Sequence, residues 1–275
     1  LHDALPIFFN EIKDLEPDYV LIENVPQMLK LKINYNGNYD TVEKIIKKEF
    51  GNTYNINKNK IINAQDYGVP QNRKRGIILL NKNNKWEFPK KEDKIITVRD
   101  AIGKLPSVEA IVDGDVNYFE GNDKKIEKCR KVHKWNVPRV HSERHVEIMR
   151  HTPTGRSAFE NKIYYPKKID GTRVKGYNTT YKRMEWDKPA PTITMANGVI
   201  SSQCNVHPGR LNKDGTYSDA RVLTVYEVMK LFTIPDDWKI PKWAKDNFIR
   251  KVIGEAVPPL LIYKIVKNLD GDNNE

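Results

Sequence analysis

The stretch Val20-Leu21-Ile22-Glu23-Asn24-Val25-Pro26 is an apolar run that ends in a carboxylate. Continuous apolar residues from Tyr19 to Ile22, following Pro17-Asp18, predict a buried strand of a parallel sheet. Because ligands of open α/β sheets bind at the carboxyl ends of the strands, Glu23 stands where chemistry is usually done. A lone Glu at a strand end more commonly caps a loop. A catalytic interpretation of Glu23 therefore depends on the rest of the chain.

The composition limits the classes of protein. The 275 residues are 39% hydrophobic and 30% charged, enough for a core in one large or two smaller domains. No apolar run approaches the roughly 18 residues of a membrane span, and no secretory leader is recognisable, so we expect a cytoplasmic protein without membrane contact. Cys129 and Cys204 allow one disulfide at most, and reduced thiols are the simpler expectation.

The positive charge is concentrated in the middle of the chain. The formal net charge is +11, and residues 121–190 alone hold 18 Lys and Arg against 8 Asp and Glu. Aromatic residues are interleaved with these cations, a pattern that suits phosphate neutralisation together with contacts to bases. A solvated Lys-rich surface has the same composition. We predict a polyanionic partner for this section.

The order of predicted elements indicates an interrupted α/β domain. Helical spacing of apolar residues covers 8–15 and 39–50, strands are predicted at 19–22, 53–63 and 76–81, and Thr97 caps a short helix through Ile102. From about 103 to 217 regularity fades, apart from a helix predicted at 142–150, before helices resume at 223–232 and 259–269. A basic, irregular insertion therefore divides the regular structure.

Four further motifs follow Glu23. Gln71-Asn72-Arg73-Lys74-Arg75 runs into the strand at 76–81, and alternation along an extended segment puts Gln71, Arg73 and Arg75 on one face. The segment 188–194 ends in Pro-Thr-Ile-Thr, and the segment 221–227 contains a capping box of Thr224 and Glu227. Gly-Glu-Ala-Val-Pro-Pro at 254–259 precedes the last helix, with proline at its start. Each motif is weak alone.

The ordered set E-N-V-P, Q-N-R-K-R, P-T-I-T, R-x-L-T-x-x-E followed by P-D-D-W, and G-x-A-V-P-P resembles the second half of a DNA (cytosine-5)-methyltransferase. The resemblance covers nearly all of 8–269. It implies an α/β fold: a truncated, Rossmann-like S-adenosylmethionine-dependent methyltransferase core with an inserted small, irregular target-recognition domain. The expected boundaries are 8–125 for the partial catalytic domain, 126–215 for target recognition and 216–275 for the return to the catalytic domain.

The resemblance also implies residue roles. Glu23 would contact the flipped cytosine at N3 and its exocyclic amine, Arg75 would hold O2, and Arg73 would support this catalytic pair. The remaining assignments are DNA binding for Thr192, Ile193 and Arg221, structural roles for Asn24, Gln71, Thr224 and Glu227, and contacts to S-adenosyl-L-methionine for Gly254, Ala256 and Val257. Arg221 would also help Thr224 and Glu227 to tie the target-recognition domain to the catalytic core.

The implied activity is methylation of C5 of cytosine in double-stranded DNA, through base flipping and a covalent Cys–C6 adduct. The resemblance further implies a monomeric restriction-modification methylase of a bacterium or phage, paired with a cognate restriction endonuclease acting on the same site. Two alternatives remain open: an RNA-directed member of the same family, and a fragment that binds DNA without catalysis.

The sequence departs from the family pattern in two places. Glu255 stands where the family has Asn, so we assign the cofactor contacts to the backbone of Ala256 and Val257. The family's Pro-Cys nucleophile and glycine-rich cofactor loop belong upstream of Glu23, and neither is in the sequence. Residues 1–7 match the translation of a common sequencing adapter, so we expect an assembly artefact there and native sequence from near Phe8. The given chain is predicted to be inactive by itself.

A zinc site is the alternative suggested by histidine spacing. Cys129-x3-His133 and His141-x3-His145, with His151 beyond, resemble zinc-ligand patterns. However, His141 and His145 have the spacing of one helix face in a basic section, where histidines commonly contact phosphate or pack. We assign no metal.

Overall fold

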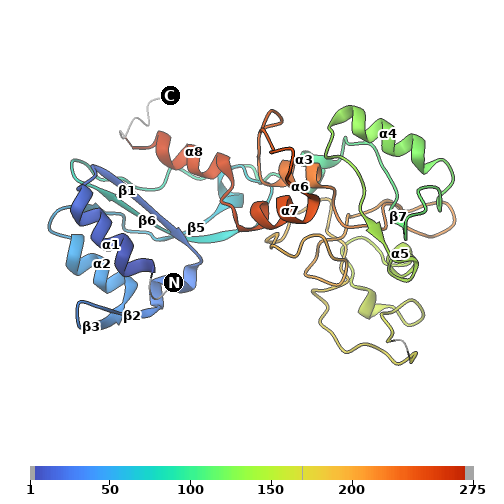
Figure 1. The fold of residues 1–275 in the computed structure, drawn as a ribbon, viewed down its shortest axis with the longest axis horizontal. Coiled ribbons are helices and arrows are strands. Elements are labelled where there is room, and N and C mark those ends of the chain that lie inside the picture. The colour runs from blue at the N-terminus through green and yellow to red at the C-terminus, as the bar shows by residue number, and fades with distance from the viewer. Residues whose placement is uncertain (1–3, 169, 270–275) are drawn as a thin grey trace. The chain divides into compact units, whose positions relative to one another are not determined.

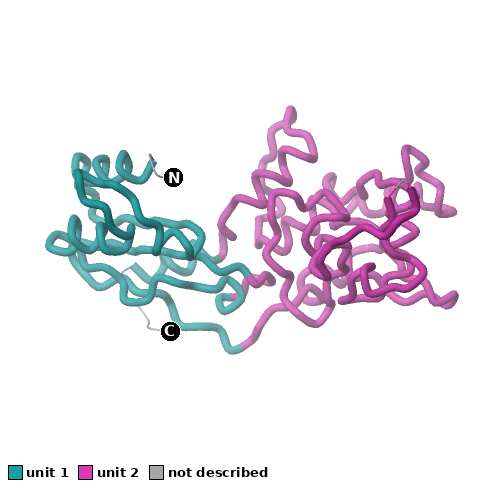
Figure 2. The backbone as a smooth tube through the Cα atoms, turned by 90° about the horizontal axis from the view of Figure 1, so that it is seen from below, with its two compact units in different colours: residues 1–67, 73–93, 261–275 teal, residues 68–72, 94–260 magenta. Residues whose placement is uncertain are grey.

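The computed structural model describes residues 4–168 and 170–269, so the part of the adapter prediction that concerns residues 1–3 lies outside the described residues. The chain divides into two compact units, coloured separately in Figure 2. Unit 1 comprises residues 1–67, 73–93 and 261–275, and unit 2 comprises residues 68–72 and 94–260. The expected domain boundaries do not coincide with these units, because the irregular insertion shares a core with the helices on either side of it.

Unit 1 is built on a four-stranded antiparallel sheet (Figure 1). Its strands are β1 (Tyr19–Asn24), β4 (Asn55–Ile56), β5 (Ile61–Asn63) and β6 (Lys74–Asn81), and the other three all pair with β6. The strand predicted at 19–22 is confirmed, but its parallel direction is wrong, since β1 runs antiparallel to β6 with Asn24 opposite Gly76. A continuous apolar run reports burial and not direction, and β6 is buried at every position after Lys74.

The sheet of unit 1 is accompanied by helices and a hairpin. These elements are α1 (Ala4–Leu15), the 3₁₀ turn η1 (Pro26–Lys30), β2 (Lys32–Tyr35), β3 (Asn38–Thr41), α2 (Val42–Phe50), the 3₁₀ turn η2 (Ala64–Tyr67) and α8 (Pro259–Lys267), which continues from unit 2. Phe9 of α1 lies edge-on to Tyr35 and Phe50, with ring centroids 5.4 and 5.8 Å away. Both predicted helices of this unit are therefore present and pack on one core.

The element boundaries in unit 1 differ from the predictions. Helix α1 begins at Ala4 and buries Leu5, so the helix includes residues assigned to the adapter. A hairpin occupies the start of the predicted 39–50 helix, because Asn36 and Gly37 both have positive φ and make a tight turn between β2 and β3. The predicted 53–63 strand is two short strands. Between them the Asn57 side chain accepts from Leu79 N and donates to Ile77 O, on the edge of β6 away from β1, where neither β4 nor β5 pairs with it.

Unit 2 contains short elements joined by long irregular segments. They are α3 (Val98–Ile102), β7 (Ile111–Val112), α4 (Asn122–Val132), β8 (Val140–His141), α5 (Glu143–Arg150), the 3₁₀ turn η3 (Ala158–Glu160), α6 (Val225–Leu231) and α7 (Asp246–Glu255). The predicted helices α3, α5 and α6 are confirmed, and so is the start of α8 at Pro259. Helices α4 and α7 were missed because each buries few apolar side chains, Ile126 and Cys129 in α4 and Ile249 and Ile253 in α7.

The main core of unit 2 lies between α3, α6 and α7. Phe232, Leu231 and Ile193 are among its fully buried side chains. The largest fully buried side chains in the described part of the protein are arginines: Arg73 in unit 1, and Arg183, Arg221 and Arg250 in unit 2. Buried charged side chains therefore contribute to the interior of the irregular chain. In that same part, none of the helices has the length and apolar character to cross a bilayer.

Candidate functional site

Glu23 is held at the end of β1 by the residues that follow it. The Asn24 side-chain oxygen accepts a hydrogen bond from Val25 N at 2.8 Å, and Pro26 begins η1, which buries Met28 and Leu29. Proline fits the first position of such a turn because no partner for its nitrogen is needed there. The Glu-Asn-Val-Pro motif thus ends the strand immediately after the carboxylate and turns the chain away.

Arg75 lies diagonally across the sheet from Glu23. Ile77 of β6 is directly opposite Glu23, so Arg75, two residues earlier, is on the same face and within reach. Its Nε contacts Glu23 Oε1 at 2.7 Å, while its Nη1 donates to Lys74 O at 2.8 Å. The Glu23 side chain keeps 23% exposure and that of Arg75 keeps 11%. The pair is positioned by the sheet and still accessible to a ligand.

Arg73 adds a second, more deeply buried cation. Burial alternates along the motif as predicted, with Gln71, Arg73 and Arg75 buried and the residues between them exposed. The Arg73 backbone N–H donates to Asn63 Oδ1 at 3.0 Å, which fixes the strand here. Burial, with the neighbouring Arg75, lowers the pKa of Arg73 to about 10, and burial also lowers that of Arg75. Two guanidiniums beside one carboxylate can hold an electron-rich oxygen of a ligand.

The first two residues of the same motif belong to unit 2. There Gln71 Oε1 accepts from Ile193 N at 3.2 Å, and Thr192 Oγ1 donates to Asn72 O at 2.8 Å. Gln71 Nε2 also donates to Leu231 O, so the buried amide joins three segments. Gln71 therefore contacts backbone atoms of two other segments of unit 2, and the exposed Thr192 lies on a segment that these bonds fix.

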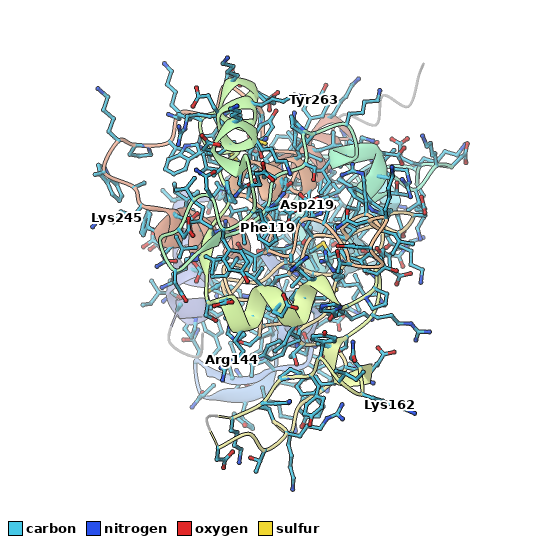
Figure 3. The ribbon with its side chains drawn as sticks, turned by 90° about the vertical axis from the view of Figure 1, so that its right-hand side faces the viewer. Phe119, Arg144, Lys162, Asp219, Lys245 and Tyr263 are labelled. Atoms are coloured by element: carbon cyan, nitrogen blue, oxygen red, sulfur yellow. The ribbon has the colours of Figure 1, made fainter. Side chains whose placement is uncertain are left out.

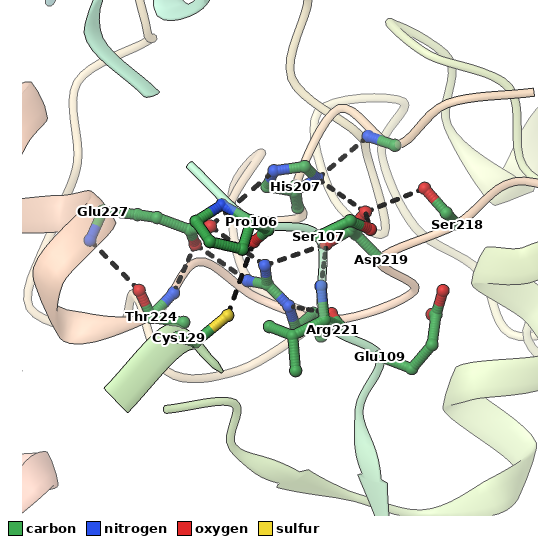
Figure 4. A network of polar contacts seen from close by, with 12 residues as sticks. Pro106, Ser107, Glu109, Cys129, His207, Ser218, Asp219, Arg221, Thr224 and Glu227 are labelled. Atoms are coloured by element: carbon green, nitrogen blue, oxygen red, sulfur yellow. Dashed lines mark hydrogen bonds and ion pairs between the residues drawn. The ribbon is translucent and has the colours of Figure 1, made fainter. Parts of the chain in front are cut away.

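A network of buried charges occupies the interior of unit 2 (Figure 4). Arg221 donates to both oxygens of Glu227 at 2.8 and 2.9 Å, to Asp219 Oδ1 at 3.0 Å and to Val108 O at 2.7 Å. Glu227 completes a capping box with Thr224, and Thr224 Oγ1 reaches Asn136 Oδ1 at 2.9 Å. The side chains of Arg221 and Asp219 are 0% exposed. The ends of the irregular insertion are thus tied to the first turn of α6.

This burial corrects two of the predicted DNA contacts. Arg221 is enclosed by two carboxylates and backbone carbonyls, and Ile193 is 1% exposed within the apolar core. Neither side chain reaches the surface in this structure. Of the three residues assigned to DNA, only Thr192 is exposed, while Arg221 has the same interior role as Thr224 and Glu227.

Sequence reasoning missed three members of the network. Asp219 also accepts from the hydroxyls of Ser107 and Ser218, and Arg183 donates to four backbone carbonyls. His207 Nδ1 accepts from Gly209 N, and burial lowers the pKa of His207 to about 4. Asp219 has a positive φ, and its carbonyl oxygen accepts a hydrogen bond from Arg221 N at 2.8 Å, so a tight turn brings the two side chains together. None of the three residues lies in a periodic pattern that the sequence could have revealed.

The predicted cofactor residues lie at the end of α7. Gly254 is buried within the helix, and a Cβ there would be 2.5 Å from the Thr194 carbonyl oxygen, so packing alone requires glycine. The Ala256 N–H bonds to Val252 O and Ile253 O, which closes the helix. Ala256 and Val257 are half-buried and Glu255 is exposed. A ligand approaching 256–257 would therefore meet backbone, with the carboxylate turned to solvent.

Both cysteines are engaged in the interior of unit 2. Cys129 Sγ lies 3.5 Å from Pro106 O, and Cys204 Sγ lies 3.7 Å from Arg183 O. Burial raises the pKa of each thiol to about 11, so both stay protonated at neutral pH. Neither has the properties of a catalytic nucleophile.

The zinc-like spacing does not assemble in space. His133 stacks on Tyr226, His151 stacks on Tyr164, and His141 Nε2 accepts from Val222 N. Within residues 4–168 and 170–269, no three His, Cys, Asp or Glu side chains are grouped as a metal site would need.

Comparisons with known proteins agree on one family. Residues 7–271 match the family model described as C-5 cytosine-specific DNA methylase. Type II methyltransferase M1.HgaI of Avibacterium volantium is 48% identical over 263 residues, which are 95% of this chain and 68% of the relative. Type II methyltransferase M.Eco47II of Escherichia coli is 27% identical over 279 residues, 95% of this chain and 56% of that protein.

Solved structures agree on the fold. A putative DNA modification methyltransferase encoded within a prophage of E. coli has a TM-score of 0.60 at 21% identity, over 98% of this chain and 76% of that one. The S. pombe Dnmt2 methyltransferase has a TM-score of 0.52 at 14% identity, over 99% and 71%. The predicted α/β methyltransferase fold is confirmed.

Proposed function

Because the chain belongs to the C-5 cytosine-specific DNA methylase family, we propose that it provides the base-binding and DNA-binding part of an enzyme that methylates C5 of cytosine in double-stranded DNA. We further propose a restriction-modification role, in which methylation protects the sites of a cognate endonuclease. This is supported by the relatives named Type II methyltransferases, one of them 48% identical. The observation that carries the proposal is the accessible Glu23–Arg75 pair at the junction of β1 and β6.

The geometry of this pair suits an extruded cytosine. A carboxyl group can hydrogen-bond with N3 and the exocyclic amine along one edge of the base, and the Arg75 guanidinium can donate to O2. A proton delivered to N3 by Glu23 withdraws electrons from C6, which favours attack by a thiolate at that carbon. Formation of the bond to C6 then makes C5 the nucleophilic carbon of an enamine, which can take the methyl group. Arg73 would add a second positive charge near Arg75, since its side chain is buried and its backbone is fixed by Asn63.

Access to C5 and C6 requires base extraction from the duplex. A stacked cytosine cannot be approached from both faces, and extrusion costs a few kcal/mol. Contacts to phosphate offset this cost and set the register of the protein on DNA. In this proposal the exposed Thr192 supplies one such contact when its hydroxyl proton turns from Asn72 O to a phosphate oxygen. Gln71 holds the same segment by accepting a hydrogen bond from Ile193 N.

S-adenosyl-L-methionine would supply the methyl group that is transferred to C5. The backbone at Ala256 and Val257 is the part of the predicted cofactor segment that a ligand can approach. Gly254 would act indirectly, by letting α7 pack on Thr194 and so placing the two residues that follow. Glu255 is exposed, so in this proposal its carboxylate stays in solvent, away from the carboxylate of the cofactor.

The test is methyl transfer from labelled S-adenosylmethionine. Protein expressed from the gene with its flanking coding sequence is offered duplex DNA or tRNA, and we expect 5-methylcytosine in the duplex. Label found only in tRNA would assign the protein to the RNA-directed branch instead. Absence of label on both substrates would contradict the proposed activity.

A parallel assay uses residues 1–275 alone. Cys129 is buried and Cys204 is half-buried, and the raised pKa of each thiol keeps it protonated at neutral pH. We therefore expect this chain to bind duplex DNA without methylating it. Methyl transfer by residues 1–275 would overturn this part of the proposal and call for a nucleophile among these two cysteines.

A further inference from the structure

A basic groove lies in unit 2 between the segment that follows α4 and the first turn of α7. It has a cavity volume of about 560 Å³, and the residues that decide its character are Arg130, Lys134, Trp135, Arg139, Lys245 and Asp246. Lys245 and the start of α7 lie outside the 121–190 section to which the sequence assigned the basic surface. The fold thus brings a second run of cations beside the first.

The groove has more positive charge than its own acids neutralise. Four cations line it and Asp246 is its one acidic lining residue. Asp246 Oδ1 is already shared by Arg139 Nη1 at 2.6 Å and Arg250 Nε at 2.9 Å. Lys134 and Lys245 are exposed and form no ion pair with any residue that the structure describes. An anion entering the groove would therefore find two lysines available.

One wall of the groove is rigid. Arg250, 1% exposed, binds Asp246 and the Asn197 side chain, and Arg139 also reaches Asn247 Oδ1 at 2.6 Å. Gly198 packs directly on Arg139, since a Cβ at Gly198 would lie 2.6 Å from Nη1. The fixed Arg139 head group and the positive end of the ten-residue α7 line the same groove as the two exposed lysines.

We propose that this groove binds the phosphate backbone of duplex DNA independently of base sequence. The inference rests on the proposed function, in which DNA is the polyanion that the protein meets. Flexible lysines act as point charges without the fixed fork that reads a base edge, so they suit phosphate better than sequence. Lys245 projects from the edge of unit 2 (Figure 3), as a backbone contact outside the recognition loops requires.

The test removes the two unpaired charges and measures the salt dependence of binding. Lys134→Gln with Lys245→Gln is compared with the unaltered chain by fluorescence anisotropy, on two labelled duplexes of unrelated sequence over a salt series. Each phosphate contact contributes about 0.9 to the slope of log K against log salt concentration, so the double variant should lose about 1.8 on both duplexes.

A matched control removes the same charge from another exposed surface of unit 2. Lys124→Gln with Lys125→Gln, at the start of α4, should leave the slope within error of the unaltered chain. Lys134→Arg with Lys245→Arg keeps the charge and should restore the slope. This second control separates loss of charge from loss of folding.

Three results would overturn the inference. An equal slope change in the α4 control would show only a general charge effect, and the proposed function would survive. A loss confined to one duplex would indicate base reading instead of phosphate binding. Failure of the unaltered chain to bind either duplex would remove both the groove inference and the DNA-binding part of the proposed function.

Discussion

Each unit contains a cluster of arginine and carboxylate side chains, and the two clusters differ in solvent exposure and in the number of ion-pair contacts. In unit 1, Glu23 and Arg75 share one contact at 2.7 Å, keep 23% and 11% side-chain exposure, and lie beside Arg73. In unit 2, Arg221 makes a bidentate contact with Glu227 and another with Asp219, at 0% exposure. An accessible cluster can bind a ligand, whereas a sealed cluster, enclosed in the interior, can only stabilise the fold.

The largest effect should come from opening the sealed cluster. Arg221→Ala leaves Glu227 and Asp219 buried without their shared cation, and breaking a buried pair from one side costs about 3–5 kcal/mol. Urea denaturation should show this loss in unit 2, with α6 the first helix to lose protection from hydrogen exchange. A variant as stable as the unaltered chain would mean that the network is not structural.

The second prediction separates activity from stability. Glu23→Gln in the active protein should lower methyl transfer by about a hundredfold or more, because the amide cannot deliver a proton to N3. Its free energy of unfolding should change by less than about 1 kcal/mol, since a single partly exposed ion pair contributes little. The matched comparison is Glu227→Gln, which should lower the free energy of unfolding by more than Glu23→Gln does, because Glu227 is buried. A Glu23→Gln protein with full activity would contradict the catalytic assignment.

Lowering the pH should destabilise unit 2 through its buried histidines. Burial lowers the pKa of His207 to about 4 and of His141 to about 3, both below the value of about 6.5 in an unfolded chain. Each imidazole is neutral when folded, so its contribution is complete above pH about 6.5 and falls by about 1.4 kcal/mol per pH unit toward its folded pKa. Both histidines belong to unit 2, whose unfolding midpoint in urea should fall over this range.

The control for the acid effect is His207→Gln. This variant should show a shallower decline of stability between pH 6.5 and 4 than the unaltered chain, whatever its stability at neutral pH. An unchanged slope would show that His207 is not buried in the neutral form.

Local signals explain what the sequence could predict. The alternation of Gln71, Arg73 and Arg75 and the capping residue Thr224 were predictable, because each depends on neighbours a few residues away. The direction of β1 was not, since burial of a strand says nothing of the chain direction of its partner. The burial of Arg221 was not either, because Val108 and Glu109 approach it from a segment far away in the sequence that lacks regular structure.

The smallest predicted effect comes from a comparison of an exposed and a buried helix-capping box. Thr97 and Thr224 both close capping boxes, on α3 and α6, but the Thr97 box is exposed and the Thr224 box is buried against Asn136. Thr97→Ala should cost about 0.5–1 kcal/mol, the usual value of a cap in water. Thr224→Ala should cost about 2 kcal/mol, because it also leaves Asn136 without its partner in the interior. Equal costs, measured by urea denaturation, would mean that burial adds nothing to the second box and that the sealed cluster is stabilised by its ion pairs alone.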